Sequence, residues 1–201
     1  MRDMSRQRAE TRQRIVQAAG ALFRQHGIDG VGVDAIMREA GMTHGGFYLY
    51  FASKEALVAA VSAEQLARSA ARWTEIGDSL SPSEALEKII GAYLDPRHLE
   101  PKDVSCVLPA LGAELARRPD SRGAVTEAMR SMIGVLAKLL PARGRARRES
   151  AAMAALSTLV GAVVLARLSS DRELADAILA SAREQTMPRL KPVHSVGGEL
   201  C

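Results

Sequence analysis

Aromatic residues are scarce in this chain: Phe, Trp and Tyr together make up 3% of its 201 residues. Runs of alternating polar and apolar residues are also missing, so the sequence gives no reason to expect a β-sheet. Alanine and leucine dominate the apolar residues, and both are strong helix formers. We therefore expect an all-α protein with enough residues for one or two compact domains.

Cysteine is almost absent as well. Cys106 and Cys201 are the two in the chain, too few for a disulfide framework or a cysteine-based metal site, and no cofactor is expected. The N-terminus lacks the apolar core of a signal peptide. The longest apolar run, residues 151–166, is shorter than the roughly 20 residues of a membrane span. We expect a cytoplasmic protein without a membrane segment, in which this run forms a buried or dimer-interface helix.

Helical spacing of apolar residues organises the first part of the chain. It predicts a first helix over residues 5–25, a second over 33–40 and a third over 43–50. Thr43 is the expected N-cap of the third helix, and Ser53 the expected N-cap of a long fourth helix. Short helices joined by a tight turn, with a first helix as support, are typical of a helix-turn-helix.

Proline, serine and acidic residues divide the second part of the chain. Residues 81–84 read Ser-Pro-Ser-Glu, which predicts a capping box with a helix-starting proline. Pro101 is expected to begin another helix, which Pro109 would kink. Residues 141–148 are expected to form a polar, basic loop rather than a second DNA contact. A second capping box is expected at residues 170–173, between the last two helices.

A block of aromatic residues follows the glycine-rich turn at residues 41–46. A helix of about two turns is not stable alone in water, so one side of it needs apolar anchors. Phe47 and Phe51 are four residues apart and are the predicted anchors. Tyr48 and Tyr50 are then expected to be available to a binding partner, and their hydroxyl groups are suited to phosphate contacts.

Basic residues are concentrated at the N-terminus, within a formal net charge of +4. This run is a possible electrostatic footprint for nucleic acid, and the alternative is an ordinary solvated helix end. The arginines concerned are Arg2, Arg6, Arg8, Arg12 and Arg14, against the two acidic residues Asp3 and Glu10.

The string from Val33 to Leu57 combines the glycine turn, the aromatic block and Ser53-Lys54-Glu55. It resembles the TetR/AcrR family of bacterial transcriptional regulators, and the likeness covers about residues 9–60. The resemblance implies a helix-turn-helix DNA-binding domain over 1–52. It also implies a helical ligand-binding and dimerisation domain over 53–187. Residues 188–201 lack periodicity and are expected to be a loose tail.

The resemblance further implies a homodimer on a double-stranded, palindromic DNA operator, acting as a ligand-responsive repressor. A small hydrophobic or electrophilic effector would release it from the operator. The sequence departs from the family at two places. Val31-Gly32 stands where relatives often have a Ser or Thr as helix cap and phosphate ligand, so that side-chain contact is not carried over. Leu49 replaces a polar or aromatic residue of many relatives, so base preference cannot be transferred. His44 is a base-contact candidate that could instead be merely exposed. The implied DNA-binding residues are Thr43, His44, Gly45, Tyr48, Tyr50 and Lys54.

The effector site is the least determined part of the sequence. Candidate ligand-binding residues, each of which could instead belong to the core, are Trp73, Tyr93, Cys106, Met129 and Met132. Cys106 allows a second function, sensing of oxidants or electrophiles by covalent modification. Lys102 would favour its thiolate and Asp103 would oppose it, which leaves an inert buried thiol as the alternative. A small helical enzyme with Cys106 as nucleophile is a remote alternative, because no histidine has a spacing that pairs it with this cysteine.

Overall fold

A computed structural model describes residues 2–99 and 106–187 of the chain, apart from the side chains of Arg2 and Asp3. These residues form eight α-helices and two short 3-10 helices, which confirms the predicted all-α class. Predictions made for Pro101 and for residues 188–201 lie outside the described residues. The elements are α1 (Arg2–His26), α2 (Val33–Glu39), η1 (His44–Leu49), α3 (Lys54–Ser79), α4 (Pro82–Tyr93), η2 (Pro96–Leu99), α5 (Val107–Ala116), α6 (Pro119–Leu139), α7 (Arg145–Leu168) and α8 (Arg172–Thr186).

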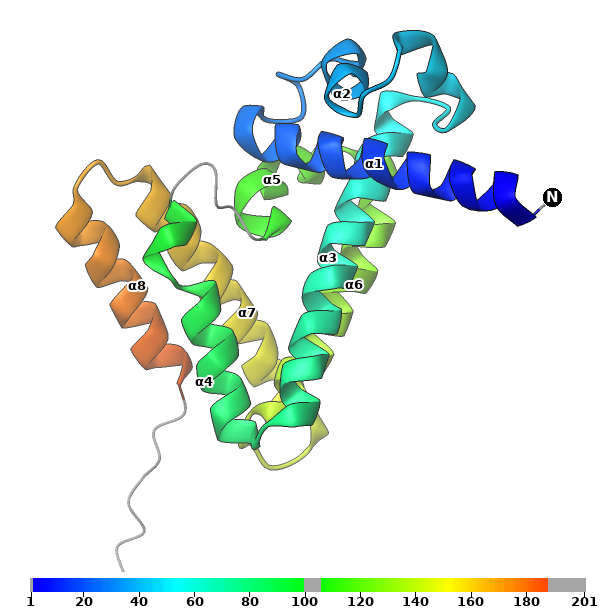
Figure 1. Cartoon of the computed structure of the whole chain (residues 1–201). Helices are drawn as coiled ribbons and strands as arrows, with labels where there is room; N and C mark the ends of the chain where they lie inside the picture. The colour runs from blue at the N-terminus through cyan, green and yellow to red at the C-terminus, as the bar shows by residue number, and fades with distance from the viewer. Residues whose placement is uncertain (1, 100–105, 188–201) are drawn as a thin grey trace, which may run out of the picture.

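The N-terminal elements α1, α2 and η1 pack on one another and on the start of α3 (Figure 1). Their shared core includes Ile15, Phe23 and Phe47, each with no exposed surface. Gly27 after α1 and Gly41 after α2 have φ angles of 74° and 71°. Only glycine adopts this left-handed conformation without strain, so these two residues set the ends of their helices.

The long helix α3 connects the N-terminal elements to the rest of the molecule. It begins at a cap in which Ser53 Oγ accepts a hydrogen bond from Ala56 N at 3.1 Å. Along its length α3 packs against α6, and the two helices run side by side in Figure 1. Trp73 is buried near its C-terminal end and Leu57 near its start, so α3 contributes to the core of both parts of the molecule.

The first predicted capping box is present at the start of α4. Ser81 Oγ accepts from Glu84 N, and the Glu84 carboxylate accepts from Ser81 N at 3.1 Å. The second box is different from the prediction. Asp171 is the cap of α8, with its carboxylate accepting from Glu173 N and Leu174 N, and Ser170 has no capping role.

The predicted kink at Pro109 was wrong. Helix α5 begins at Val107, so Pro109 lies in its first turn. The backbone N–H groups of a first turn have no acceptor within the helix, so a proline there removes no helical hydrogen bond and need not kink the helix. Cys106 is therefore the N-cap residue of α5 and does not lie in the second turn of a helix. The basic loop is also shorter than expected, because α7 begins at Arg145 and takes in half of the 141–148 segment.

Helix α7 is long and apolar enough by length and composition to cross a membrane, with a mean hydropathy of 1.9 over its most apolar window. The core helix of a globular protein has the same character. Its buried residues, such as Ala152, Leu159 and Val163, recur on one face and pack against α5, α6 and α8. We therefore assign α7 to the helical core, as the sequence predicts for this run.

Candidate DNA-binding surface and effector cavities

The aromatic block is divided between core and surface. Phe47 is fully buried and Phe51 is 4% exposed, and their rings stack with centroids 5.8 Å apart. The predicted anchors are thus confirmed. Tyr48 contacts the edge of Phe47 at 5.3 Å but is 64% exposed, and Tyr50 is half-buried against the core. Tyr48 therefore has the freer hydroxyl group for a partner.

The element that carries the predicted recognition residues is a 3-10 helix rather than an α-helix. Thr43 is its N-cap residue as predicted, but the Thr43 side chain makes no capping hydrogen bond. The side chain instead remains exposed, together with His44 and Gly45. His44 Nδ1 lies 2.5 Å from Asp34 Oδ1, a link between α2 and η1 that no motif in the sequence indicates.

Two N-terminal arginines hold the recognition element. Arg8 donates a hydrogen bond to Leu49 O at 2.8 Å, and the Arg12 guanidinium lies 4.8 Å from the centre of the Phe51 ring. Arg6 forms an ion pair with Glu10 along the exposed face of α1. Part of the basic run thus stabilises the fold, a role that neither sequence interpretation, a DNA footprint or a solvated helix end, included.

A polar cluster at the α5–α6 corner attaches the N-terminal elements to the C-terminal helices. We call it the clasp, and it consists of Glu114 and Arg118 with their partners. Glu114 Oε2 accepts from Ile28 N at 2.8 Å. Arg118 donates to Glu55 at 2.6 Å and also to Asp29. Burial lowers the pKa of Arg118, but these two hydrogen bonds outweigh it and the net shift is upward.

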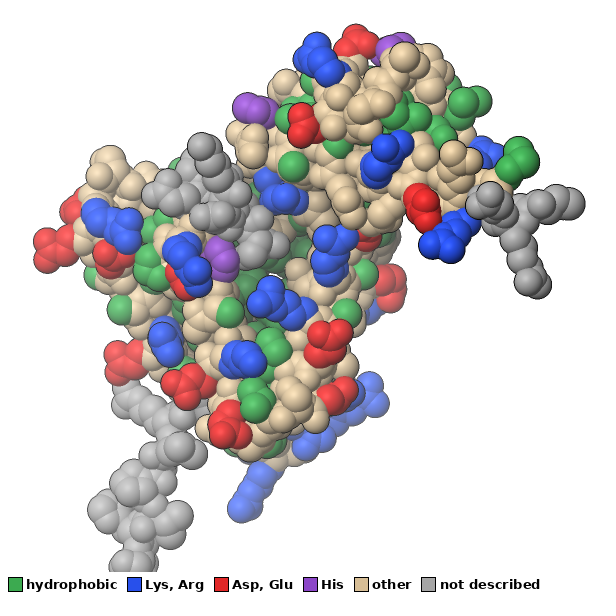
Figure 2. Space-filling model, in the orientation of Figure 1, with side chains coloured by type: hydrophobic (Ala, Val, Ile, Leu, Met, Phe, Trp, Pro, Cys, Tyr) green, Lys and Arg blue, Asp and Glu red, His purple; other side chains and the backbone are tan. Residues whose placement is uncertain are grey.

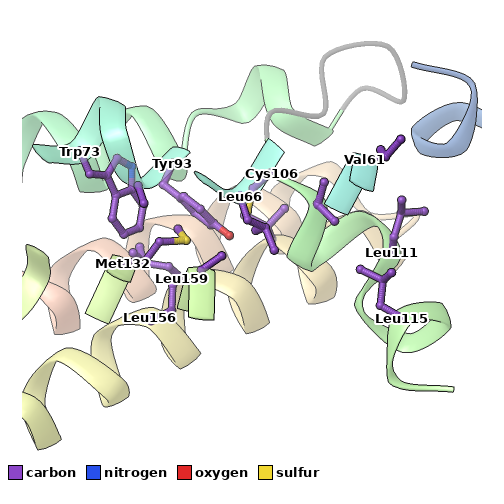
Figure 3. Packing of buried hydrophobic residues seen from close by; sticks show 14 of the residues in the cluster. Val61, Leu66, Trp73, Tyr93, Cys106, Leu111, Leu115, Met132, Leu156 and Leu159 are labelled. Carbon is purple, nitrogen blue, oxygen red and sulfur yellow. The ribbon is translucent and has the colours of Figure 1, made fainter. Parts of the chain in front are cut away.

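Three of the five candidate effector residues surround one cavity. Trp73, Tyr93 and Cys106 line a space of about 570 Å³ between α1, α3 and α4. The Trp73 and Tyr93 rings meet edge to face with centroids 5.9 Å apart, and Figure 3 shows Met132 beneath them. Met132 is fully buried and belongs to the core. We call this space the basic cavity, because four arginines also line it.

Met129 faces a different space. An apolar cavity of about 780 Å³ lies between α5, α6 and α7, lined by residues that include Leu115, Met129, Ile133 and Leu156. The sequence prediction placed Met129 and Met132 in one set of candidate pocket residues. Their helix turns them toward different surroundings.

Cys106 is buried, at 5% exposure, and burial raises the pKa of its thiol. Smaller opposing contributions come from Tyr93, the Leu108 backbone and Arg167. A thiol that stays protonated and covered is a poor nucleophile. His98 lines the same cavity but directs Nδ1 to Tyr93 O at 3.1 Å.

Within the described residues, no group of three or more His, Cys, Asp or Glu side chains is arranged to hold a metal ion. The described residues also form two cavities, one with basic and one with apolar lining.

Comparison with known proteins decides which class of molecule carries these features. Residues 15–61, which hold the C-terminal half of α1, all of α2 and η1, and the start of α3, match the family model of "Bacterial regulatory proteins, tetR family". The structure of a TetR transcriptional regulator from Legionella pneumophila superposes with a TM-score of 0.72 at 22% identity, covering 87% of this chain and 96% of that one. Residues 15–61 therefore belong to the tetR family of bacterial regulatory proteins, and the chain as a whole has the fold of the TetR regulator from Legionella. The N-terminal part of the chain is thus that of a DNA-binding transcriptional regulator.

Relatives of known sequence agree with this assignment. The uncharacterised regulator YerO of Bacillus subtilis (strain 168) is 33% identical over 89 residues, which are 43% of this chain and 31% of YerO. The uncharacterised regulator Mb2274c of Mycobacterium bovis is 27% identical over the whole of both chains. The chain thus spans about a third of the length of YerO and of YvdT, a second uncharacterised regulator of Bacillus subtilis (strain 168).

Proposed function

We propose that this regulator is a ligand-responsive repressor that binds a palindromic operator as a homodimer in the cytoplasm. Residues 1–52 form its DNA-binding domain and residues 53–187 its effector-binding and dimerisation domain. A small hydrophobic effector binds the second domain and releases the first from DNA. The observation that carries this proposal is the clasp, because the helices that line the apolar cavity also hold the N-terminal elements.

The proposed DNA contacts are built on the exposed residues of η1 and on the start of α3. Thr43, His44 and Gly45 form the groove-facing side, while the hydroxyl of Tyr48 contacts phosphate. Tyr50, which is half-buried, and Lys54 complete the backbone contacts. Phosphate contacts of this kind fix the protein on the duplex, and base contacts supply the sequence preference.

The proposed dimer interface is the outer face of α7 and α8. Leu165 and Leu174 are 56% and 52% exposed, and Leu168 at the end of α7 is 77% exposed. Leu165 and Leu174 lie on an apolar groove of about 500 Å³ between the two helices. Exposed leucines grouped in this way are typical of a surface that another subunit covers. Two such subunits would place their recognition elements in successive major grooves, roughly 34–36 Å apart.

The route from effector to DNA begins at α5. Leu115 lines the apolar cavity, Glu114 holds the backbone of Ile28, and Arg118 follows directly after the helix. A ligand that displaces α5 therefore displaces the clasp. Release requires only that the ligand binds the DNA-incompetent arrangement more tightly than the competent one.

An electrophile or oxidant sensor acting through Cys106 is the alternative. The burial of its thiol and its raised pKa argue against this function. Mass spectrometry after mild alkylation separates the two. A Cys106 adduct that abolishes DNA binding would support covalent sensing, and an unmodified thiol would support a non-covalent effector.

The test of the proposed function is a gel shift with the DNA upstream of the regulator's own gene, repeated over a range of salt concentrations. Specific binding whose affinity falls steeply with salt is expected, because cationic side chains displace counterions from phosphates. Unrelated DNA of the same length is the control. Equal binding to both DNAs, or no binding at low salt, would refute the repressor.

A further inference from the structure

The basic cavity has an unusual combination of charge and apolar surface. Its lining contains four arginines and one glutamate together with an aromatic pair. Figure 2 shows basic side chains grouped over this face of the molecule, between α3 and α4. The lining residues used below are Gln17, Arg24, Glu64, Gln65, Arg68, Arg72, Trp73 and Tyr93.

The positive charge of the basic cavity is incompletely balanced. Burial and then the nearby charge of Arg68 lower the pKa of Arg24, which shows that cations crowd one another here. Glu64 is the acidic residue of the lining and is already engaged by Gln13 at 2.5 Å and Arg68 at 2.6 Å. Within the described residues the side chain of Arg72 has neither a hydrogen bond nor an ion pair. An anion entering this cavity would relieve the imbalance.

The floor of the cavity offers apolar surface and one polar group that lacks a partner. Trp73 is 6% and Tyr93 is 7% exposed. The buried Tyr93 hydroxyl has no well-formed hydrogen bond within the described structure, although it lies near the Cys106 thiol. A buried polar group without a partner costs free energy, so a ligand atom that hydrogen-bonds to it would be stabilised.

We propose that the basic cavity binds an amphipathic organic anion, a carboxylate on an apolar body. The carboxylate lies against Arg68 and Arg72, and the apolar body lies over Trp73 and Tyr93. This site is separate from the apolar cavity of the proposed function. Only the expected effect of the bound anion on DNA binding rests on the proposed function.

The position of the cavity gives the anion a direct effect on the N-terminal elements. Gln17 and Arg24 come from α1, and Arg24 donates to Gln65 of α3 at 2.7 Å. A ligand held by both helices therefore favours one relative placement of α1 and α3. Such a ligand shifts DNA affinity without passing through the clasp.

Trp73 makes the binding test specific, because it is the single tryptophan of the chain. We would titrate the full-length protein with decanoate, and with 1-decanol as the uncharged match, and follow tryptophan fluorescence without DNA. Saturable quenching by decanoate is expected. Arg72→Gln and Arg68→Gln should each raise its Kd about tenfold, because a charge-assisted hydrogen bond is lost.

Arg122→Gln is the matched control, since Arg122 lines the apolar cavity and not the basic one. It should leave the Kd for decanoate unchanged. Circular dichroism would confirm that all three variants are folded. Equal affinity for 1-decanol, an effect of Arg122→Gln alone, or no fluorescence change while calorimetry records binding would each overturn the proposal. Because the titration contains no DNA, its failure would not bear on operator binding, and a failed gel shift would not bear on the cavity.

Discussion

Arg118→Gln tests whether the clasp holds the two parts of the regulator together. The Arg118 side chain is 13% exposed and donates to Glu55 at 2.6 Å and to Asp29. Its acceptors are more exposed, at 43% for Glu55 and 74% for Asp29. The substitution keeps a polar side chain but removes the charge and the forked donor geometry.

The expected loss follows from this exposure. An ion pair open to solvent contributes about 0.2–1 kcal/mol, and the shielding of the guanidinium places these two pairs toward the upper end. We therefore expect the free energy of unfolding to fall by about 1–2 kcal/mol, which lowers Tm by roughly 2–4 °C per kcal/mol in a chain of this size. Arg117→Gln is the control, because the Arg117 side chain makes no hydrogen bond or ion pair within residues 2–99 and 106–187.

Urea unfolding at one fixed protein concentration measures the effect, since the stability of a dimer depends on concentration. A double-mutant cycle with Glu55→Gln then isolates the Arg118–Glu55 interaction. A coupling free energy of about 0.5–1 kcal/mol is expected. The clasp would be refuted if Arg118→Gln destabilised the protein no more than Arg117→Gln does. It would also be refuted if the effects of the two substitutions in the cycle were simply additive.

Four further predictions follow from the surface, the helices and the buried thiol. Gly45→Ala should weaken operator binding in a gel shift without lowering Tm, because a Cβ at this position meets no protein atom within 4 Å; unchanged binding would show that DNA does not approach Gly45 closely. Lys54→Gln should reduce the slope of log Kobs against log salt by about 1 if it contacts one phosphate, and a parallel salt plot would exclude that contact. Leu165→Glu should shift the protein toward monomer in analytical ultracentrifugation, because it puts a charge into the proposed interface; a dimer of unchanged affinity would place the interface elsewhere. Burial raises the pKa of Cys106, so the native state binds more protons and stability should fall as pH rises above the ordinary thiol pKa, about 8.5; a Cys106→Ser variant with the same alkaline loss would contradict this.

Local signals made the N-terminal part predictable from the sequence. Glycine after α1 and after α2 ends each helix because its φ is positive there. The cap at Ser53 and the box at Ser81 depend on residues no more than three positions away. Phe47 and Phe51 could be recognised as anchors because their spacing puts them on one side of a short helix. Features that depend on neighbours in the chain are the ones that a single sequence specifies well.

Contacts between distant segments were not predictable. Arg118 reaches residues 89 positions away at Asp29 and 63 positions away at Glu55. Nothing in the sequence marks these three as partners. The interpretation of Pro109 as a kink failed for a related reason, since it depended on where α5 begins. Helix α5 begins at Val107, and both Cys106 and Val107 are buried.

The two cavities offer a ligand two different routes to the DNA-binding elements. In the proposed mechanism the apolar cavity acts on them through α5 and the clasp, whereas the basic cavity is lined directly by α1. Coupling between binding sites is reciprocal, so operator DNA must change the affinity of each ligand by the factor with which that ligand changes DNA affinity. Arg118→Gln should therefore reduce the coupling free energy between a hydrophobic effector and DNA, but leave the coupling free energy between decanoate and DNA unchanged. The same loss for both ligands would mean that α1 and the clasp move as one body and that the regulator has a single allosteric route.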